Sequence, residues 1–392
     1  MNFSAPAQAE QEYIRALRRH FHQNPELSLH EYQTTEDIAA ELAALGIPVT
    51  RFEGHTGLMA DLVGGKPGKT VLLRADIDAL PIRENTGLPY ASQNGAMHAC
   101  GHDCHAAMLL GAAKLLAPHR DELCGTVRFL FQAAEETSMG SLYFIDHGCL
   151  DGVDAAFGMH IWSGLEAPLI SVESGPRMSA CDNFELTVHG TAAHGASPHL
   201  GCDAIVAAAA AVTQLQGYVA RRHDAFQPLV ITVGTIRGGE QFNIVADTVT
   251  MTGTARCFDP ALRARLEGDL SALFSAACLP SGCTAEFKWI PTARPVSNDD
   301  SALTAIGRRA AETLYGPEGL GHLPPVMVSE DFAFYSEHVP TLFAFLGGRN
   351  EALDAVYPHH NECFRIDEEA LPRGAALYAQ FAYDYLNGAD NG

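Results

Sequence analysis

Two cysteines, three histidines and an aspartate lie within the twelve-residue stretch AMHACGHDCHAA, residues 96–107. Thiolate, imidazole and carboxylate groups are the side chains that bind zinc and related divalent metals. Cys100 and His102 stand two positions apart and would not share a helix face, so a loop is the simplest way to bring both onto one ion. Gly101 between them permits a sharp backbone path. The alternative is an inert buried thiol beside a core histidine.

Three further groups of polar residues are candidates for the same chemistry. Glu135 and Glu136 follow the β-rich run FLFQAA, and adjacent side chains there diverge, so one carboxylate could bind a metal while the other moves a proton. His160 closes the run AAFGMH, and His359 and His360 lie in the loop YPHHNECF. Each group alone has an ordinary explanation as a solvated strand end or a core histidine. Three of the four nevertheless lie at or just after the carboxyl ends of predicted strands, where open α/β sheets gather their ligands.

The elements that must position these residues alternate between helix and strand. Apolar spacing predicts helices over 9–20, 33–45 and 104–117, and β-rich runs predict strands over 57–63, 70–77, 125–133 and 154–162. A helix over 303–315, a strand over 342–347 and a helix over 368–386 continue the pattern. Strands separated by helices indicate a doubly wound α/β domain, here with a mixed sheet.

The middle of the chain has a different order of elements. From about residue 182 to residue 290 we expect strand, helix, strand, strand, helix and strand, which is the ferredoxin-like βαββαβ order. A self-contained unit inserted in an α/β domain fits a lid carried on two hinges. The sequence therefore predicts a catalytic domain formed by residues 1–181 and 294–392, and an α+β lid domain over residues 182–293 that also serves dimerisation.

The composition of the chain limits the kinds of molecule that it could bind. The chain has 392 residues, long enough for two domains, and its net charge of −22 argues against nucleic acid and anionic membranes as partners. Ten cysteines without framework spacing are typical of reduced thiols. The amino-terminal residues lack the pattern of a signal peptide, and no window is apolar enough to span a membrane. We therefore expect a cytoplasmic protein that acts on a small molecule.

The motifs of the chain resemble a family of metal-dependent amidohydrolases that includes aminoacylases, carboxypeptidase G and hippurate hydrolase. Within that family the chain is most similar to the branch of hippurate hydrolase and the auxin-conjugate hydrolases. Ten motifs in order carry the resemblance over nearly the whole chain: RRHFHQNPELSLHE (18–31), LLRADIDALPI (72–82), MHACGHD (97–103), FQAAEE (131–136), FGMHIW (157–162), HGTAAHGASPHLGCDAI (189–205), QFNIVAD (241–247), GTARCFD (253–259), SEDFAFY (329–335) and PHHNECF (358–364).

The resemblance implies a two-metal site and assigns roles to its residues. Glu135 would be the general base and acid, and Cys100 would bridge the ions. Carboxypeptidases of the family place a metal histidine in an H-x-D motif, whereas this chain has Arg74, Ala75 and Asp76 there. Asp76 would then hydrogen-bond to a ligand imidazole and orient it. The implied metal ligands are Cys100, His102, Glu136, His160 and His360.

The chain departs from the family pattern next to His360, and the resemblance also assigns roles to residues of the lid. His359 stands where the family has leucine and Glu362 where it has proline, which leaves His359 as an alternative ligand to His360. In the lid, His194 would hold the oxyanion across a dimer interface. Three further residues are implied in substrate binding: Asn243 and Arg256 would grip a substrate carboxylate, and Gly347 would let backbone pass near the substrate unless it simply forms a turn.

These features predict an enzyme that hydrolyses the amide bond of N-acyl-L-amino acids. Hippurate-like, N-acetyl or aryl-acyl conjugates would yield a carboxylic acid and a free amino acid. Two divalent ions per subunit are expected, with Zn or Mn first and Co or Ni compatible. The expected assembly is a homodimer through the lid, with a tetramer left open. The alternatives are a dipeptidase or aminobenzoyl-glutamate hydrolase with the same two-metal mechanism, and a catalytically silent metal-binding protein.

Overall fold

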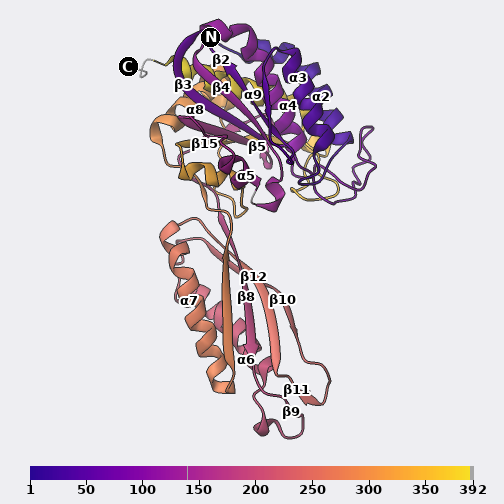
Figure 1. The fold of residues 1–392 in the computed structure, drawn as a ribbon, viewed down its shortest axis with the longest axis vertical. Coiled ribbons are helices and arrows are strands. Elements are labelled where there is room, and N and C mark those ends of the chain that lie inside the picture. The colour runs from indigo at the N-terminus through magenta and orange to yellow at the C-terminus, as the bar shows by residue number, and fades with distance from the viewer. Residues whose placement is uncertain (139, 389–392) are drawn as a thin grey trace. The chain divides into compact units, whose positions relative to one another are not determined.

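The chain folds into two compact units, seen in a computed structural model that describes residues 1–138 and 140–388 (Figure 1). The first unit comprises residues 1–177, 297–324 and the segment from residue 331 onward. The second unit comprises residues 178–296 and also the short segment 325–330, which sequence analysis did not anticipate. This segment joins the second unit because the N–H of Ser179 donates to the carbonyls of Val326 (3.1 Å) and Val328 (2.9 Å).

A seven-stranded mixed sheet forms the middle of the first unit. Its four central strands are mutually parallel, and the strands outside them pair antiparallel. The α/β class with a mixed sheet, predicted from the alternation of elements, is therefore confirmed. Parallel strands bring the residues at their carboxyl ends to one edge of the sheet. The strand order is β1 (Val49–Arg51), β2 (Leu58–Val63), β4 (Cys124–Gln132), β3 (Lys66–Asp76), β5 (Ala155–Glu166), β15 (Thr341–Arg349) and β6 (Ile170–Ser171).

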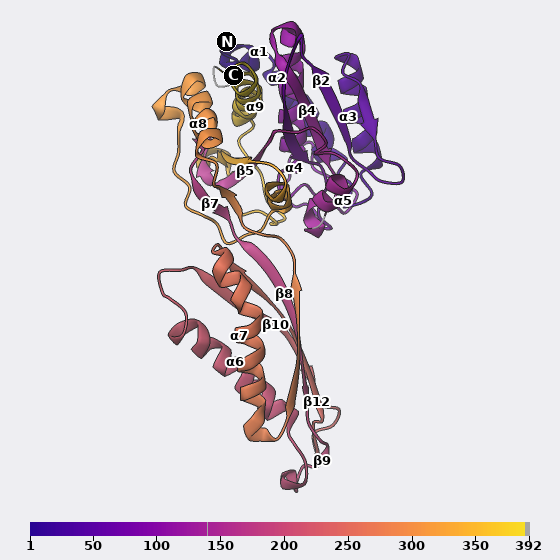
Figure 2. The same cartoon turned by 60° about the vertical axis from the view of Figure 1, so that its left-hand side comes forward.

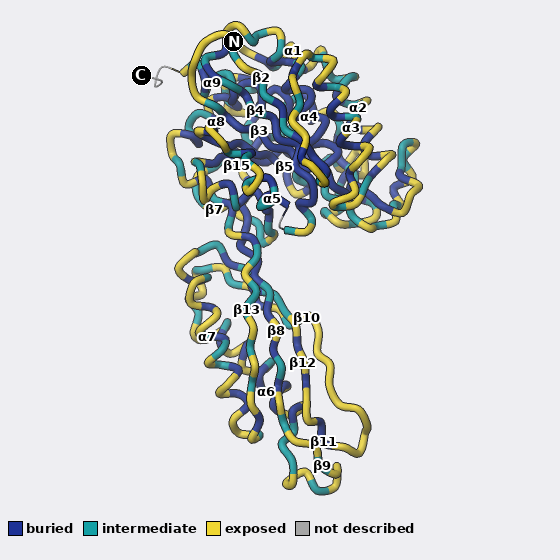
Figure 3. Tube along the Cα trace, in the orientation of Figure 1, coloured by how far each residue is buried: buried dark blue, intermediate teal, exposed yellow. Residues whose placement is uncertain are grey.

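Helix α4 (His102–Leu116) is the most deeply buried helix of this unit. Every residue except Lys114 is buried, and Figure 3 shows the helix in dark blue beside the sheet. An apolar surface all round is what a helix needs when other helices cover it. Its main neighbours are α9 (Leu371–Asn387) and α2 (Gln11–Gln23). The other helices are α1 (Ser4–Ala9), α3 (Tyr32–Ala44), α5 (Gly140–Asp146) and α8 (Ser301–Tyr315).

The second unit has the βαββαβ order. Its antiparallel sheet runs β10-β12-β8-β13, the strand order of a ferredoxin-like fold. Both helices cover one face of this sheet, as Figure 2 shows, and a two-stranded ribbon of β9 (Ala193–His194) and β11 (Ile244–Val245) lies at one end. The elements are β8 (Ala180–His189), α6 (Ala204–Arg221), β10 (Leu229–Gly238), β12 (Thr248–Cys257), α7 (Pro260–Cys278) and β13 (Thr284–Pro291). Two short strands, β7 (Gly175–Met178) and β14 (Val296–Asn298), pair with each other.

Membrane spans and disulfides can be examined over the same residues. None of the helices within 1–138 and 140–388 has the length and apolarity needed to cross a bilayer. All ten cysteines lie in the described part of the chain, and each is a free thiol.

Candidate active site

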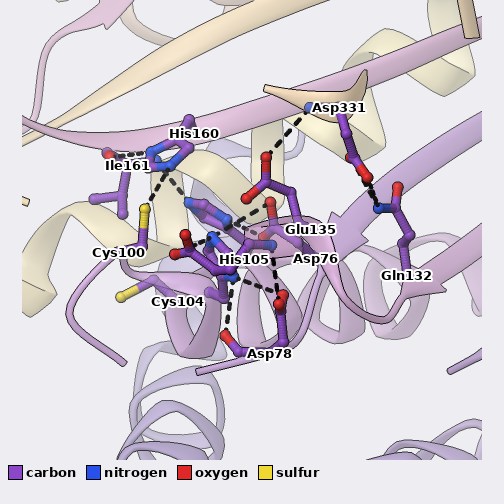
Figure 4. Close-up of polar contacts among 12 residues, drawn as sticks. Asp76, Asp78, Cys100, Cys104, His105, Gln132, Glu135, His160, Ile161 and Asp331 are labelled. Carbon is purple, nitrogen blue, oxygen red and sulfur yellow. Dashed lines mark hydrogen bonds and ion pairs between the residues drawn. The ribbon is translucent and has the colours of Figure 1, made fainter. Parts of the chain in front are cut away.

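The candidate site lies at the carboxyl edge of the large sheet, where α4 begins (Figure 4). Cys100 immediately precedes Gly101, which adopts φ 98°, a left-handed conformation that glycine tolerates. A Cβ at this position would lie 2.4 Å from Cγ2 of Ile161 on β5. Glycine is therefore needed to bring Cys100 and His102 against the strand that carries His160, as the sequence predicts.

The hydrogen bonds of His102 define which of its nitrogens is free. Its Nδ1 lies 2.9 Å from the main-chain oxygen of Asp78 and 3.2 Å from the Asp78 carboxylate. Both partners are acceptors, so Nδ1 carries the proton. The buried Nε2 makes no hydrogen bond among the described residues. Burying a nitrogen lone pair without a hydrogen-bond partner lowers the stability of the fold, and a bound metal ion would give this lone pair a partner.

His160 is held in the same tautomer. Its Nδ1 donates to the carbonyl of Ile161 at 2.5 Å, and its Nε2 lies 3.5 Å from Sγ of Cys100. The lone pair of Nε2 is therefore directed toward the thiol. Burial of the Cys100 thiol raises its pKa well above 9, and the nearby Glu136 carboxylate raises it further. A thiolate at this position therefore calls for a compensating cation.

Glu136 and His360 complete the group of donors. Oε1 of Glu136 is buried without a hydrogen-bond partner within the described ranges. It lies 3.9 Å from Nε2 of His102 and 3.4 Å from Nε2 of His360. The N–H of His360 donates to the carbonyl of Ala99 at 2.8 Å, which ties this loop to the residue before Cys100.

The five donors that the resemblance implied as ligands thus converge in the structure. The ligand atoms of Cys100, His102 and Glu136 all lie within 4.8 Å of one another. One thiol, three imidazoles and one carboxylate suit divalent transition metals, zinc above all. Two of the donor atoms are buried and otherwise unsatisfied, so the residues present fit such ions.

His105 lies among these donors without being available to a metal. It falls within 4.8 Å of His102 and His160, measured between ligand atoms. Its Nδ1 lies 2.5 Å from Oδ1 of Asp76, and its Nε2 accepts the N–H of Ile161 at 2.9 Å. Both ring nitrogens are thus occupied. His105 is a buried residue whose Nε2 fixes the backbone of β5.

The partner that orients a ligand imidazole is Asp78 rather than Asp76. Asp76 contacts His105 and forms an ion pair with Arg74 at 2.6 Å, and its Oδ2 lies 3.7 Å from Nε2 of His102. Asp78 instead holds Nδ1 of His102 and accepts the N–H of Glu136 at 3.0 Å. Sequence reasoning missed Asp78, although its spacing of two from Asp76 places both carboxylates on one side of an extended chain.

His359 makes other contacts than His360. Its Nε2 accepts the N–H of Ser163 at 3.2 Å, so the neutral ring carries its proton on Nδ1. The ring lies against Trp162, with centroids 4.5 Å apart. His360, by contrast, directs Nε2 toward Glu136. The ligand atoms of His359, Cys100 and His160 also lie within 4.8 Å of one another, so the structure brings both histidines to the donors, and His360 stays the predicted ligand.

An unusual turn at Ala134 separates the side chains of Glu135 and Glu136. Ala134 adopts φ 61°, which is uncommon for a residue with a side chain, and Glu31 accepts its N–H at 2.9 Å. The turn lets Glu135 and Glu136 diverge, and the buried Glu135 accepts the N–H of Asp331 at 3.2 Å. One carboxylate thus faces the metal donors, and the other is held by a different loop.

A buried network fixes the loop that holds Glu135. Arg74 contacts the Asp331 carboxylate at 2.8 Å and Gln132 at 2.9 Å, and Gln132 donates to Asp331 at 2.9 Å. Within the first unit, Asp331 orders the loop next to Glu135. No local signal identified Arg74 or Gln132 as its partners.

The titration of Glu31 gives a test of this arrangement. Burial raises the pKa of Glu31 from 4.5 to about 7, and the Asp78 carboxylate adds to the effect. The folded protein then holds a proton that the unfolded chain has released, so the free energy of unfolding falls as pH rises through this interval. Relative to the variant Glu31→Gln, we expect wild type to lose about 2–3 kcal/mol between pH 5 and pH 8. Urea unfolding of both proteins at the two pH values measures this; an equal pH dependence of both would contradict it.

The implied lid residues lie in the second unit. His194 is on β9 opposite Ile244 of β11, and the N–H of Gly195 donates to the carbonyl of Asn243 at 2.7 Å. The structure therefore brings His194 and Asn243 side by side. Arg256 is on β12, on the side of the sheet that the helices leave open, since Ala255 and Cys257 on the other side are buried.

Gly347 lies within β15 and not in a turn. A Cβ at this position would come 2.1 Å from the carbonyl oxygen of Glu166, so the close approach of that segment accounts for the glycine. Its N–H donates to the carbonyl of Leu169 at 2.7 Å. A contact with substrate is not needed to explain this residue.

The fold and the converging donors together define a metal-dependent hydrolase. Residues 72–384 match the model of peptidase family M20/M25/M40, and the chain belongs to this family. The resemblance inferred from the motifs is thereby confirmed.

Curated relatives and a solved structure agree with this membership. An N-acetyl-L-cysteine deacetylase of Bacillus subtilis is 40% identical over 376 residues, covering 95% of this chain and 88% of the relative. An IAA-amino acid hydrolase of Arabidopsis thaliana is 35% identical over 96% of this chain and 86% of its own length. The structure of a Bacillus subtilis protein described as a dinuclear metal binding peptidase of the M20 family is 34% identical. It covers 96% of this chain and 99% of that one, with a TM-score of 0.85.

Proposed function

We propose that this enzyme hydrolyses the amide bond of N-acyl-L-amino acids to a carboxylic acid and a free amino acid. The observation that carries the proposal is the convergence of Cys100, His102, Glu136 and His160 beside a separate carboxylate, Glu135. Relatives at 40% and 35% identity are a deacetylase of N-acetyl-L-cysteine and a hydrolase of IAA-amino acids, both of which act on acylated amino acids.

The chemistry divides between the metal ions and the protein. When bound, two divalent cations would acidify a water molecule and polarise the scissile carbonyl. Glu135 takes the proton of the attacking water and passes it to the nitrogen as the carbon–nitrogen bond breaks. Its buried position and the N–H of Asp331 keep the carboxylate oriented during both transfers. Zn or Mn is the expected pair, and Co or Ni also suits these donors.

The second unit supplies the remaining groups in this proposal, as a lid. The Nδ1 of exposed His194 accepts the N–H of Ala196 at 3.1 Å, so its neutral ring carries the proton on Nε2. That N–H is the donor that an oxyanion requires. Asn243 beside it and Arg256 on the open face of the sheet would bind the substrate carboxylate.

The lid also provides the proposed dimer contact. Strand β10 is at the edge of its sheet, and in the described part of the chain no strand pairs with its outer side. Val230 and Ile236 on this strand are exposed, and such an edge needs cover. A second copy of the chain would supply it and bring its own His194 to the neighbouring site. Free thiols at all ten cysteines support a reducing, cytoplasmic location.

The direct test measures amino acid release from a panel of substrates. N-acetyl and N-benzoyl amino acids are compared with dipeptides and aminobenzoyl-glutamate, before and after removal of metal by a chelator. We expect the acyl amino acids to be hydrolysed fastest, activity to fall roughly 100-fold or more on chelation, and Zn²⁺ or Mn²⁺ to restore it. Full activity in metal-free protein would refute the metal mechanism, and faster cleavage of dipeptides would refute the substrate class.

A further inference from the structure

Four charged side chains lie buried behind the metal donors and have no part in the chemistry proposed above. Arg18 and His22 come from α2, Glu84 from the chain between β3 and α4, and Asp103 from the first turn of α4. Each side chain is at most 1% exposed. We refer to these four residues as the α2 cluster.

His22 joins the two carboxylates of the α2 cluster. Its Nδ1 lies 2.7 Å from Oδ2 of Asp103 and its Nε2 lies 3.1 Å from Oε1 of Glu84. Carboxylates can only accept, so the ring carries protons on both nitrogens and is a cation. Arg18 adds a second cation, with Nε 2.9 Å from the same oxygen of Asp103. Arg18 also lies 3.2 Å from the Glu368 carboxylate, and its Nη2 lies 3.2 Å from Nδ1 of His22, so two cations in contact with each other face three carboxylates. Charges are tolerated in a protein core when they are paired in this way.

The contact between His22 and Asp103 connects the α2 cluster to His102. Asp103 follows this ligand directly in the sequence, and its Oδ1 accepts the N–H of Cys104 at 2.9 Å. The Asp103 side chain is therefore fixed between His22 and the backbone of α4. The first turn of α4, which presents His102 to the metal donors, is held from behind by α2.

The contact between His22 and Glu84 connects the α2 cluster to the loop that bears His360. Glu84 accepts the N–H of Ser92 at 2.6 Å, which closes the segment 84–92 into a loop. This loop contacts the segment that bears His360: the N–H of Asn85 donates to the carbonyl of Glu362 at 2.8 Å. Arg365 donates to the carbonyl of Thr86 at 2.7 Å.

We propose that His22 is a positioning residue that couples the first turn of α4 to the His360 loop and so sets the spacing of the metal donors. It touches neither substrate nor metal and acts through Asp103 and Glu84. The inference rests on the proposed function only in taking His102 and His360 as metal ligands.

Two substitutions of His22 test its contacts with Asp103 and Glu84 one at a time, because asparagine and glutamine each reproduce one ring nitrogen of histidine. In His22→Asn the amide occupies the place of Nδ1, retains the contact with Asp103 and loses Glu84. In His22→Gln it occupies the place of Nε2, retains Glu84 and loses Asp103. Glu84→Gln has one accepting oxygen where the carboxylate has two, so it loses either the contact with His22 or the hydrogen bond from Ser92, without altering α2. The matched control is His20→Asn, on the same helix, which removes a half-exposed contact with Asp37 at 2.7 Å.

Zn²⁺ affinity, measured by competition with a chromophoric chelator, and hydrogen exchange of the metal-free protein are the two readouts. We expect both His22 variants and Glu84→Gln to bind Zn²⁺ about 10–100-fold more weakly than wild type, and His20→Asn to be unchanged. Exchange should rise in 84–92 and 357–365 for His22→Asn and Glu84→Gln, and in the first turns of α4 for His22→Gln.

The proposal is overturned if these variants melt earlier but keep Zn²⁺ affinity within twofold of wild type, because that is the result of a purely structural role. It is also overturned if exchange rises equally in both regions for both His22 variants. A wild-type protein that binds no Zn²⁺, Mn²⁺, Co²⁺ or Ni²⁺ would refute the proposed function instead. The exchange pattern would still decide whether His22 couples the two segments.

Discussion

Glu135→Gln should lower kcat by about 10²–10⁴-fold while two metal ions per subunit remain bound. The amide cannot take up the proton of water or deliver one to the leaving nitrogen. It can still accept the N–H of Asp331, which lies 3.2 Å from the native carboxylate, so the fold around it is kept. The metal donors Cys100 and Glu136 are untouched by the change.

Turnover of an N-acyl amino acid and metal content by elemental analysis, on the same preparation, check this prediction. Glu166→Gln is a suitable control, because this exposed glutamate lies at the end of β5 and pairs with Arg349. A kcat within tenfold of wild type would remove Glu135 from the role of base. Loss of metal together with activity would show that Glu135 acts as a ligand instead. A wild-type protein that binds metal but hydrolyses no substrate of the panel would favour a silent metal-binding protein.

Cys100→Ser should abolish tight binding of at least one ion and lower turnover by roughly 100-fold or more. Sγ of Cys100 lies near both groups of donors: it is 3.5 Å from Nε2 of His160 and within 4.8 Å of the ligand atoms of His102 and Glu136. A thiolate in this position can serve both ions. A serine hydroxyl of similar size is far less acidic and is a poor ligand for transition metals.

Metal content after gel filtration and the absorption of the Co²⁺ form measure this effect. The thiolate-to-cobalt band in the near ultraviolet should be present in wild type and absent in Cys100→Ser. The matched control is Cys104→Ala, which removes a fully buried thiol from the first turn of α4, just after Cys100 in the sequence, and should keep the band. Retention of two ions and of the band in Cys100→Ser would contradict a bridging role for Cys100.

Both of these predictions concern residues that the sequence already singled out. The donor types stand in short motifs, and the strands and helices around them follow from local apolar spacing, since a period of two or of 3.6 residues is visible without a structure. The mixed α/β sheet and the ferredoxin-like unit were predictable for this reason. Helix α4, expected over 104–117 and found at His102–Leu116, illustrates how closely local pattern fixes an element.

The hydrogen-bond partners of the site were not predictable in the same way. Asp78 fixes the tautomer of His102 across 24 positions, Asp331 supports Glu135 across 196, and His22 meets Asp103 across 81. Each contact depends on which segments the sheet and α4 bring together, and the residues themselves are common charged or polar types.

The sequence by itself therefore determined which side chains could bind metal, and in what kind of fold. Only the tertiary structure shows which nitrogen of each histidine is free, and that Asp76 contacts His105. It also shows that the segment 325–330 belongs to the second unit. The physical reason for this difference is that apolar periodicity depends only on residues that are close together in the sequence. The satisfaction of buried polar atoms depends on neighbours that only folding creates.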